Sequence, residues 1–208
     1  MLVIATDCVG GHYYTALNIP HNHPFFWCVI PPETLLKLIT EYDIINFENA
    51  TLDKSSKWYI WSSAKNTFDI ILDGKYHIHY IHNKLSPDDY DIRKNGGDFL
   101  YRYAYKLTWD NYIRRLSRMR ETNEIPKFII TEHNGYGYDI KTMTLLAEKT
   151  KYPLAILTNK NIKTTNPLVR IIKVSDYHIT HYDNGRTQYI LNEVKPYLDL
   201  WLGLKPDI

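Results

Sequence analysis

Two runs of apolar, mostly β-branched residues dominate the sequence and restrict the folds that are open to it. Leu2–Thr6 (LVIAT) and Phe128–Thr131 (FIIT) lack the alternation of apolar and polar residues that marks a strand with one solvated face. Continuous apolar runs of this length are typical of strands that are buried on both faces, as in parallel sheets covered by helices. We therefore expect both segments to be interior strands of such a sheet.

Helical periodicity alternates with further strand-like segments along the chain. A helix is expected from Pro32, because proline is favoured in the first helical turn. The Asp73-Gly74 pair lies between two strand-like runs and predicts a β-hairpin. Together these patterns predict a three-layer α/β fold, with a mostly parallel mixed sheet, helices on both faces and one antiparallel hairpin. We expect a single domain over residues 1–208, with a weak subdivision near 84–98, where the sequence is polar and rich in turn-forming residues.

Composition limits the cellular compartments and the classes of binding partner that we expect for this protein. Lys and Arg total 25 against 23 acidic residues, and a net charge of +2 gives no reason to expect a nucleic-acid partner. No segment approaches the ~20 consecutive apolar residues that span a bilayer, and the N-terminus lacks the basic region of a signal peptide. The two cysteines, Cys8 and Cys28, cannot by themselves form a disulfide framework or a four-ligand zinc site. We expect a cytoplasmic protein whose association with membranes, if any, is peripheral.

Each of the two buried runs ends in an acidic residue that is soon followed by glycine. In open α/β sheets, ligands bind beyond the carboxyl ends of the strands, and glycine lets backbone N–H groups approach an anion closely. The candidate site residues of these two loops are Asp7, Cys8, Gly10, Gly11 and Glu132. Neither a dinucleotide-binding nor a P-loop motif is present. A phosphate ligand is therefore compatible with the loops, while tight turns explain the glycines equally well.

Three histidines fall in the strand-like segment KYHIHYIH. His77 and His79 are expected on one face of the strand and His82 on the other. An imidazole can act as a general base near neutral pH. Two histidines at this spacing could share a metal ion, but no third ligand is marked and no H-E-x-x-H motif occurs. Polar strand faces or hydrogen-bonded core histidines explain the pair better, so no metal site is predicted.

An arginine cluster in the helical segment NYIRRLSRM is the sharpest candidate for anion binding. On a helix Arg114 and Arg118 share one face, whereas Arg115 projects about 100° away. Guanidinium groups match phosphate or carboxylate through two parallel hydrogen bonds. A solvated basic face beside Glu121 and Glu124 is the alternative, and RNA contact lacks any supporting signature.

Six segments, taken in order, resemble a known family: ATDCVGGHYYTALNI, HPFFWCVIPPETLLKLI, YIHNKLS, NYIRRLSRM, KFIITEHNGYGYDI and YPLAILTNKN. They are similar to an uncharacterised bacterial family, number 1919 among the domains of unknown function, often labelled exopolysaccharide-biosynthesis protein. That family typically opens with a strand ending in Asn-Cys-x-Gly-Gly and a following tyrosine. It continues with a Phe-x-His-Tyr strand end, a Lys-Trp-x-Arg-Arg-x-x-Arg helix and a strand that ends in an acid.

The family motifs are carried over residue by residue. The opening motif falls on Cys8, Gly10, Gly11 and Tyr14, with Asp7 in place of the usual asparagine. The histidine falls on His82, which is followed by Asn83 instead of tyrosine. The arginine helix falls on Arg114, Arg115 and Arg118, with Tyr112 in place of tryptophan, and Glu132 takes the position of the acid.

The resemblance implies a soluble glycosyl- or acyltransferase of surface or exopolysaccharide biosynthesis. Its co-substrate would be a phosphate-bearing donor, a nucleotide sugar or an acyl-CoA, and its acceptor a glycan. His82, Glu132 and Asp7 would be the catalytic residues, while the arginines hold the donor phosphate. No D-x-D motif of the usual nucleotide-sugar kind is present, and PDDYD, with Asp88, Asp89 and Asp91, is a weak substitute in a loop, so an obligatory divalent metal is not expected. The alternative is a non-catalytic scaffold whose arginine helix docks an acidic glycan or a partner protein, in which case the arginines should be exposed.

Overall fold

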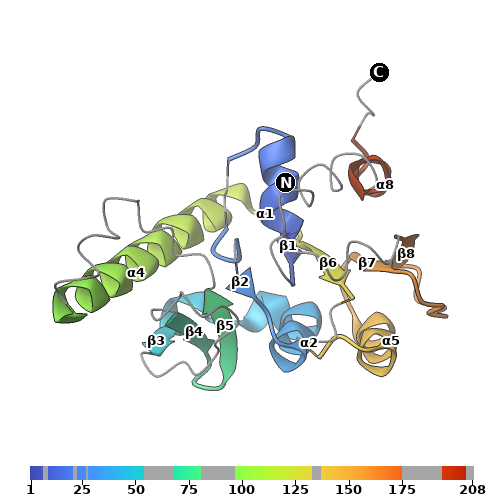
Figure 1. Ribbon diagram of the computed structural model, residues 1–208. Coiled ribbons are helices and arrows are strands. Elements are labelled where there is room, and N and C mark those ends of the chain that lie inside the picture. Colours follow the sequence, from blue (N-terminus) through green and yellow to red (C-terminus); the bar gives the residue numbers. More distant parts are fainter. Residues whose placement is uncertain are drawn as a thin grey trace.

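The computed structural model describes residues 1–6, 9–20, 23–26, 28–53, 68–80, 97–132, 137–174 and 194–204 of the chain (Figure 1). The elements in chain order are β1 (Val3–Ala5), α1 (Val9–Ala16), β2 (Cys28–Val29), α2 (Pro32–Glu41), β3 (Thr51–Asp53), β4 (Phe68–Leu72), β5 (Tyr76–Tyr80), α4 (Gly97–Thr122), β6 (Lys127–Thr131), α5 (Ile140–Lys149), β7 (Leu154–Thr158), β8 (Val169–Lys173) and α8 (Lys195–Leu202). Two short 3-10 helices, Tyr42–Ile44 and Phe47–Asn49, follow α2.

A parallel sheet forms one half of the fold. Its four strands have the order β1-β6-β7-β8, and all three pairings are parallel. Residues Leu154–Thr158 of β7 are buried without exception, as are all residues of β6 except the first. The apolar runs of the sequence therefore correspond to strands with both faces covered, as predicted.

The two faces of this sheet belong to different apolar clusters. Phe128 and Ile156 pack in a cluster that includes buried residues of α2 and α5. Their strand neighbours Ile129 and Leu157 pack in a second cluster with residues of α1 and α8. Successive strand residues point to opposite faces, so this division follows from the pleat. Figure 1 shows α1 and α8 above the sheet and α2 and α5 below it.

Strand β1 is buried but stands at the end of the strand order, not in the interior position that we predicted. Side chains cover its outer edge instead of another strand. The Val3 N–H donates to the Tyr14 hydroxyl at 3.0 Å, and the Val3 carbonyl lies 2.6 Å from Nε2 of His23. Beyond the strand, the Ile30 N–H donates to the Thr6 carbonyl at 3.1 Å. These contacts satisfy backbone groups that an open edge would leave to another chain.

The remaining strands form a separate antiparallel sheet with the order β2-β5-β4-β3. The predicted hairpin is confirmed as β4–β5, and its turn residues Asp73 and Gly74 both have positive φ, 51° and 66°. Two positive φ values are the signature of a tight turn at these two residues, and the strand pairing resumes at Tyr76, which lies opposite Leu72. The prediction of one mixed sheet is wrong, because the hairpin pairs with β2 and β3 and not with the parallel strands. The α/β class itself is confirmed.

Helix α4 borders the region in which we expected a weak subdivision. In the part of this helix whose side chains are described, Tyr112, Leu116 and Met119 are buried and join the cluster around α2 and α5. Residues 84–96 of the expected subdivision lie outside the described residues. Among the helices that are described, none is both long and apolar enough to cross a bilayer.

Candidate functional site at the carboxyl edge of the parallel sheet

Of the three predicted catalytic residues, Glu132 is the one that lies within the described residues. It follows directly after β6. Its backbone N–H donates to the Leu157 carbonyl at 3.0 Å, which extends the β6–β7 pairing by one residue. The side chain is only 5% exposed, and its Oε2 accepts a hydrogen bond from the hydroxyl of Thr158, the last residue of β7. A buried carboxyl group is thus held across the carboxyl ends of two adjacent strands, where α/β sheets place their ligands.

Threonine hydroxyls organise the rest of this edge. The Thr131 N–H donates to Oγ1 of Thr6 at 3.3 Å, which links the ends of β6 and β1. The hydroxyl of Thr158 also accepts the Lys160 N–H at 3.0 Å. Asn159, which follows Thr158 in the chain, has a buried Oδ1 without a hydrogen-bond partner in the described part of the protein. A buried oxygen without a donor is unfavourable, so this atom marks a place where a ligand or water can donate.

A lysine fixes the loop that begins at Asn159. Lys173, the last residue of β8, donates from Nζ to the carbonyl oxygens of Asn159 and Lys160 and to Oδ1 of Asn161 at 2.8 Å. The carboxyl edge therefore carries a cation at β8 and a carboxyl group at β6. Both are held by hydrogen bonds that they make with neighbouring strands or loops.

One of the two glycines of α1, Gly10, is explained by packing against β1. A Cβ atom added to Gly10 would lie 2.9 Å from Cβ of Ala5, closer than carbon atoms pack. Gly11 is buried in the same helix. For Gly10 the structure thus favours close helix–strand packing over a path for a ligand. Asp7 and Cys8, which precede the helix, lie outside the described residues.

Tyr14 is fully buried, and its hydroxyl is already engaged. The hydroxyl donates to the Met1 carbonyl at 2.6 Å and accepts the Val3 N–H at 3.0 Å. Burial raises the pKa of the phenol. The described contacts make Tyr14 a cover for the edge of β1, and its role in substrate binding remains a prediction.

The three candidate arginines of α4 do not all point in the same direction. Arg114 and Arg118 are exposed, and Nη2 of Arg114 donates to Oδ1 of Asn111 at 2.6 Å. Arg115 is half-buried, with its guanidinium carbon 6.0 Å from the centre of the Phe26 ring. Phe26 in turn packs on Tyr14 of α1, with ring centres 4.6 Å apart. Arg115, not the Arg114–Arg118 pair that spacing favoured, is the arginine directed toward α1.

A second polar cluster lies on the hairpin β4–β5. Asp69 is 2% exposed, and each of its carboxylate oxygens faces one histidine. Oδ1 lies 2.7 Å from Nδ1 of His79, and Oδ2 lies 3.1 Å from Nδ1 of His77. The His77 side chain is 39% exposed, whereas that of His79 is buried. This arrangement places Nδ1 of both rings toward the carboxylate and leaves Nε2 of the exposed ring as a proton acceptor. His82 lies outside the described residues.

Sequence reasoning placed the two histidines correctly on one strand face but missed Asp69. The strands pair with Leu72 opposite Tyr76, which leaves three residues between them and sets Asp69 directly opposite His79. A two-residue turn at Asp73-Gly74 would instead set Asp69 opposite Ile78, on the other face of the hairpin. The turn signal therefore could not assign the carboxylate to this face, and only the structure does so.

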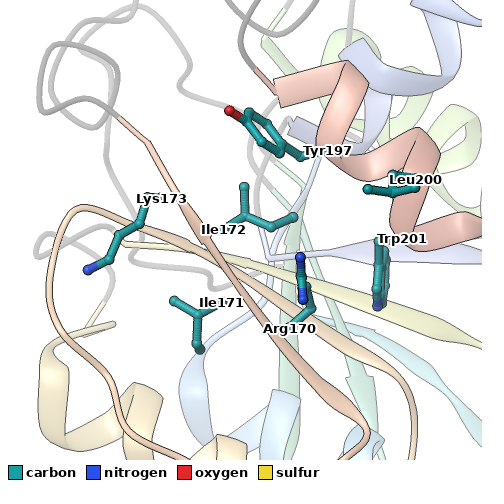
Figure 2. Close-up of a pocket in the computed structure, with 7 residues that line it drawn as sticks. All are labelled: Arg170, Ile171, Ile172, Lys173, Tyr197, Leu200 and Trp201. Atoms are coloured by element: carbon teal, nitrogen blue, oxygen red, sulfur yellow. The ribbon is translucent and has the colours of Figure 1, made fainter. Parts of the chain in front are cut away.

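A pocket of about 410 Å³ lies between β8 and α8 (Figure 2). Its lining consists of Arg170, Ile171, Ile172, Lys173, Tyr197, Leu200 and Trp201. None of these residues was predicted as a site residue. In this view the Arg170 side chain extends toward α8, where Trp201 stands, while Lys173 points away from the helix. The sequence could not mark this pocket, because strand and helix are more than twenty residues apart and their side chains match no motif.

Metal ligation has no support in the part of the protein that is described, where no three His, Cys, Asp or Glu side chains are placed to share an ion. The described cysteine, Cys28, is buried in β2. No protein-family model matches the chain, and no curated protein sequence matches it.

Proposed function

We propose that this protein is a transferase of surface or exopolysaccharide biosynthesis that moves a glycosyl or acyl group from a phosphate-bearing donor to a glycan hydroxyl. In this proposal the chain forms a three-layer α/β fold and binds its substrates beyond the carboxyl edge of the parallel sheet. The observation that carries the proposal is the buried Glu132 carboxyl group, held by Thr158 at that edge. The motif resemblance along the sequence supports the choice of reaction.

The chemistry assigns Glu132 the role of general base. Its carboxylate would take the proton of the acceptor hydroxyl while the hydroxyl oxygen forms the new bond to the transferred carbon. The bond from that carbon to the donor phosphate, or to the donor sulfur in an acyl-CoA, breaks, and the leaving group departs with the electron pair. The hydrogen bond from Thr158 fixes the carboxylate, and the unpaired Oδ1 of Asn159 could accept from a substrate hydroxyl.

The test is a transfer assay with a matched control. Purified wild type, Glu132→Gln and Glu148→Gln are incubated with nucleotide sugars or acyl-CoAs and a glycan extract, and release of nucleotide or free CoA is measured. Glu148 is an exposed residue of α5 and controls for loss of one carboxylate. We expect Glu132→Gln to lose roughly a hundredfold or more in rate, as is typical when a general base is removed. Full turnover by this variant, or no release from any donor by the wild type, would contradict the proposal.

The second candidate is a scaffold that binds an acidic glycan or partner protein without turnover. The exposure of Arg114 and Arg118 on α4 favours it, because a docking helix presents its cations to solvent. Under this alternative, lysine should replace either arginine with little loss, and salt should release the partner, because exposed charges are strongly screened. A salt-resistant complex that lysine substitution abolishes would exclude it.

A further inference from the structure

The pocket between β8 and α8 combines positive charge with flat, exposed rings. Among the described residues, its lining includes two cations and no carboxylate, and its volume of about 410 Å³ is in the range of small-ligand sites. Tyr197 is 55% exposed and Trp201 half-exposed. The two aromatic residues are four positions apart on α8, so they share one side of the helix. Aromatic rings grouped in a hollow beside a cation are typical of ligand-binding grooves.

Helix α8 is anchored firmly by its opposite side. The Tyr13 hydroxyl of α1 donates to Oδ1 of the buried Asp199 at 2.5 Å, and Lys195 donates to Oδ2 of the same residue at 2.7 Å. Leu198 and Leu202 are buried in the cluster shared with α1. Because these contacts fix the helix against the sheet, the aromatic side is held in place and does not need to be ordered by a ligand.

Arg170 is the cation directed at this helix. Arg170 lies two residues before Ile172 on β8, and side chains two residues apart point to the same face of a strand. Ile172 is buried in the cluster that includes α8, so the Arg170 side chain also leaves the strand on the α8 side. Figure 2 shows its guanidinium group extending from β8 toward the helix that carries Trp201. Within the described residues, the side chain of Arg170 has neither a hydrogen bond nor an ion pair. Lys173 is occupied by the loop at 159–161, which leaves Arg170 available for an anion.

We propose that this pocket binds a nucleotide, with the base stacked on Trp201 and Tyr197 and a phosphate group paired with Arg170. A nucleotide carries both an aromatic ring and phosphate charge, whereas a neutral sugar lacks the charge and an acidic sugar lacks the aromatic ring. Base–aromatic stacking and bidentate guanidinium–phosphate pairs are the two interactions that the lining offers. The interpretation of this nucleotide as part of the transfer donor rests on the proposed function, whereas the binding itself does not.

The experiment measures nucleotide binding by isothermal titration calorimetry to the purified full chain. The probes are UDP, which represents nucleotide sugars, ADP, which represents the nucleotide part of CoA, and inorganic pyrophosphate. The variants are Arg170→Ala and Tyr197→Ala, both at exposed positions, and Arg120→Ala is the control, because it removes an exposed arginine of α4 that neither proposal uses. Far-UV circular dichroism and the urea midpoint show whether each variant remains folded.

We expect UDP or ADP to bind the wild type and the control alike. Arg170→Ala should weaken binding roughly ten- to a hundredfold, as is typical for a lost charge-assisted pair. Tyr197→Ala should weaken it roughly fivefold or more through lost stacking. Preference for UDP or for ADP identifies the donor class.

Three results would overturn the inference: no binding of either nucleotide at millimolar concentration, equal binding by all variants, or pyrophosphate binding as tightly as the nucleotides. None of them decides the proposed function, which depends on the Glu132→Gln transfer assay. Equal binding by all variants would place the nucleotide elsewhere on the protein, and loss of activity in Glu132→Gln would still support the transferase.

Discussion

Substitution of Gly10 by alanine tests whether α1 is packed against β1 as closely as the structure indicates. The new Cβ atom would lie 2.9 Å from Cβ of Ala5 and 3.6 Å from the Ala5 backbone nitrogen. Non-bonded carbon atoms are most favourable at roughly 3.5–4.0 Å. The helix must therefore move away from the strand by about half an ångström or more, or both backbones must distort.

Two opposing effects set the stability of the Gly10→Ala variant. Overpacking of a core contact typically costs about 1–3 kcal/mol, whereas alanine in place of glycine inside a helix stabilises it by about 1 kcal/mol. The single substitution should therefore range from nearly neutral to about 2 kcal/mol destabilising. A double-mutant cycle with Ala5→Gly separates the two effects, because it removes the atom that the new methyl group contacts. We expect Gly10→Ala to be more favourable by about 1–3 kcal/mol in the Ala5→Gly background.

The assay is urea unfolding of the four proteins of the cycle, followed by far-UV circular dichroism. A control cycle pairs Gly10→Ala with Ala147→Gly, a buried position of α5 on the other face of the sheet. Distant sites should be additive within about 0.5 kcal/mol. A coupling energy between Gly10 and Ala5 that is no larger than this would refute the packing explanation and restore the interpretation of Gly10 as a ligand-facing glycine.

Two further predictions concern charged groups. Asp139 caps α5 by accepting the Thr142 N–H at 2.8 Å, and this hydrogen bond lowers the pKa of the carboxyl group. A carboxyl group with a lowered pKa stabilises the fold at pH values above its unfolded-state pKa of about 4, and this stabilisation is lost as the pH falls through the lowered pKa. The stability advantage of the wild type over Asp139→Asn should therefore vanish in that pH range. A constant difference in urea midpoint down to pH 2 would count against this prediction. Asp69 should hold both His77 and His79 in the tautomer that carries the proton on Nδ1, which nitrogen NMR spectra of the imidazoles can show. In Asp69→Asn the single amide oxygen can accept from only one ring, so at least one histidine should change tautomer. Unchanged spectra would contradict the arrangement.

The local elements of this fold could be predicted from the sequence because each depends on a short stretch of chain. The apolar runs around Ile4 and Ile129 indicated strands with two buried faces, Pro32 marked the start of α2, and Asp73-Gly74 marked the hairpin. Periodicity and turn chemistry are properties of neighbouring residues. They carry no information about which strand pairs with which, and for this reason the two separate sheets were not foreseen.

The candidate sites divide in the same way. The sequence by itself determined that Glu132 ends a buried strand and that Arg114 and Arg118 share a helix face. Only the tertiary structure decided that Thr158 holds the Glu132 carboxyl group and that Arg115 is directed toward α1. It also decided that Arg170 and Trp201 line one pocket. Such contacts join residues that are far apart in the chain, and they form because burial of the whole set of apolar faces brings the elements together, which no local pattern records.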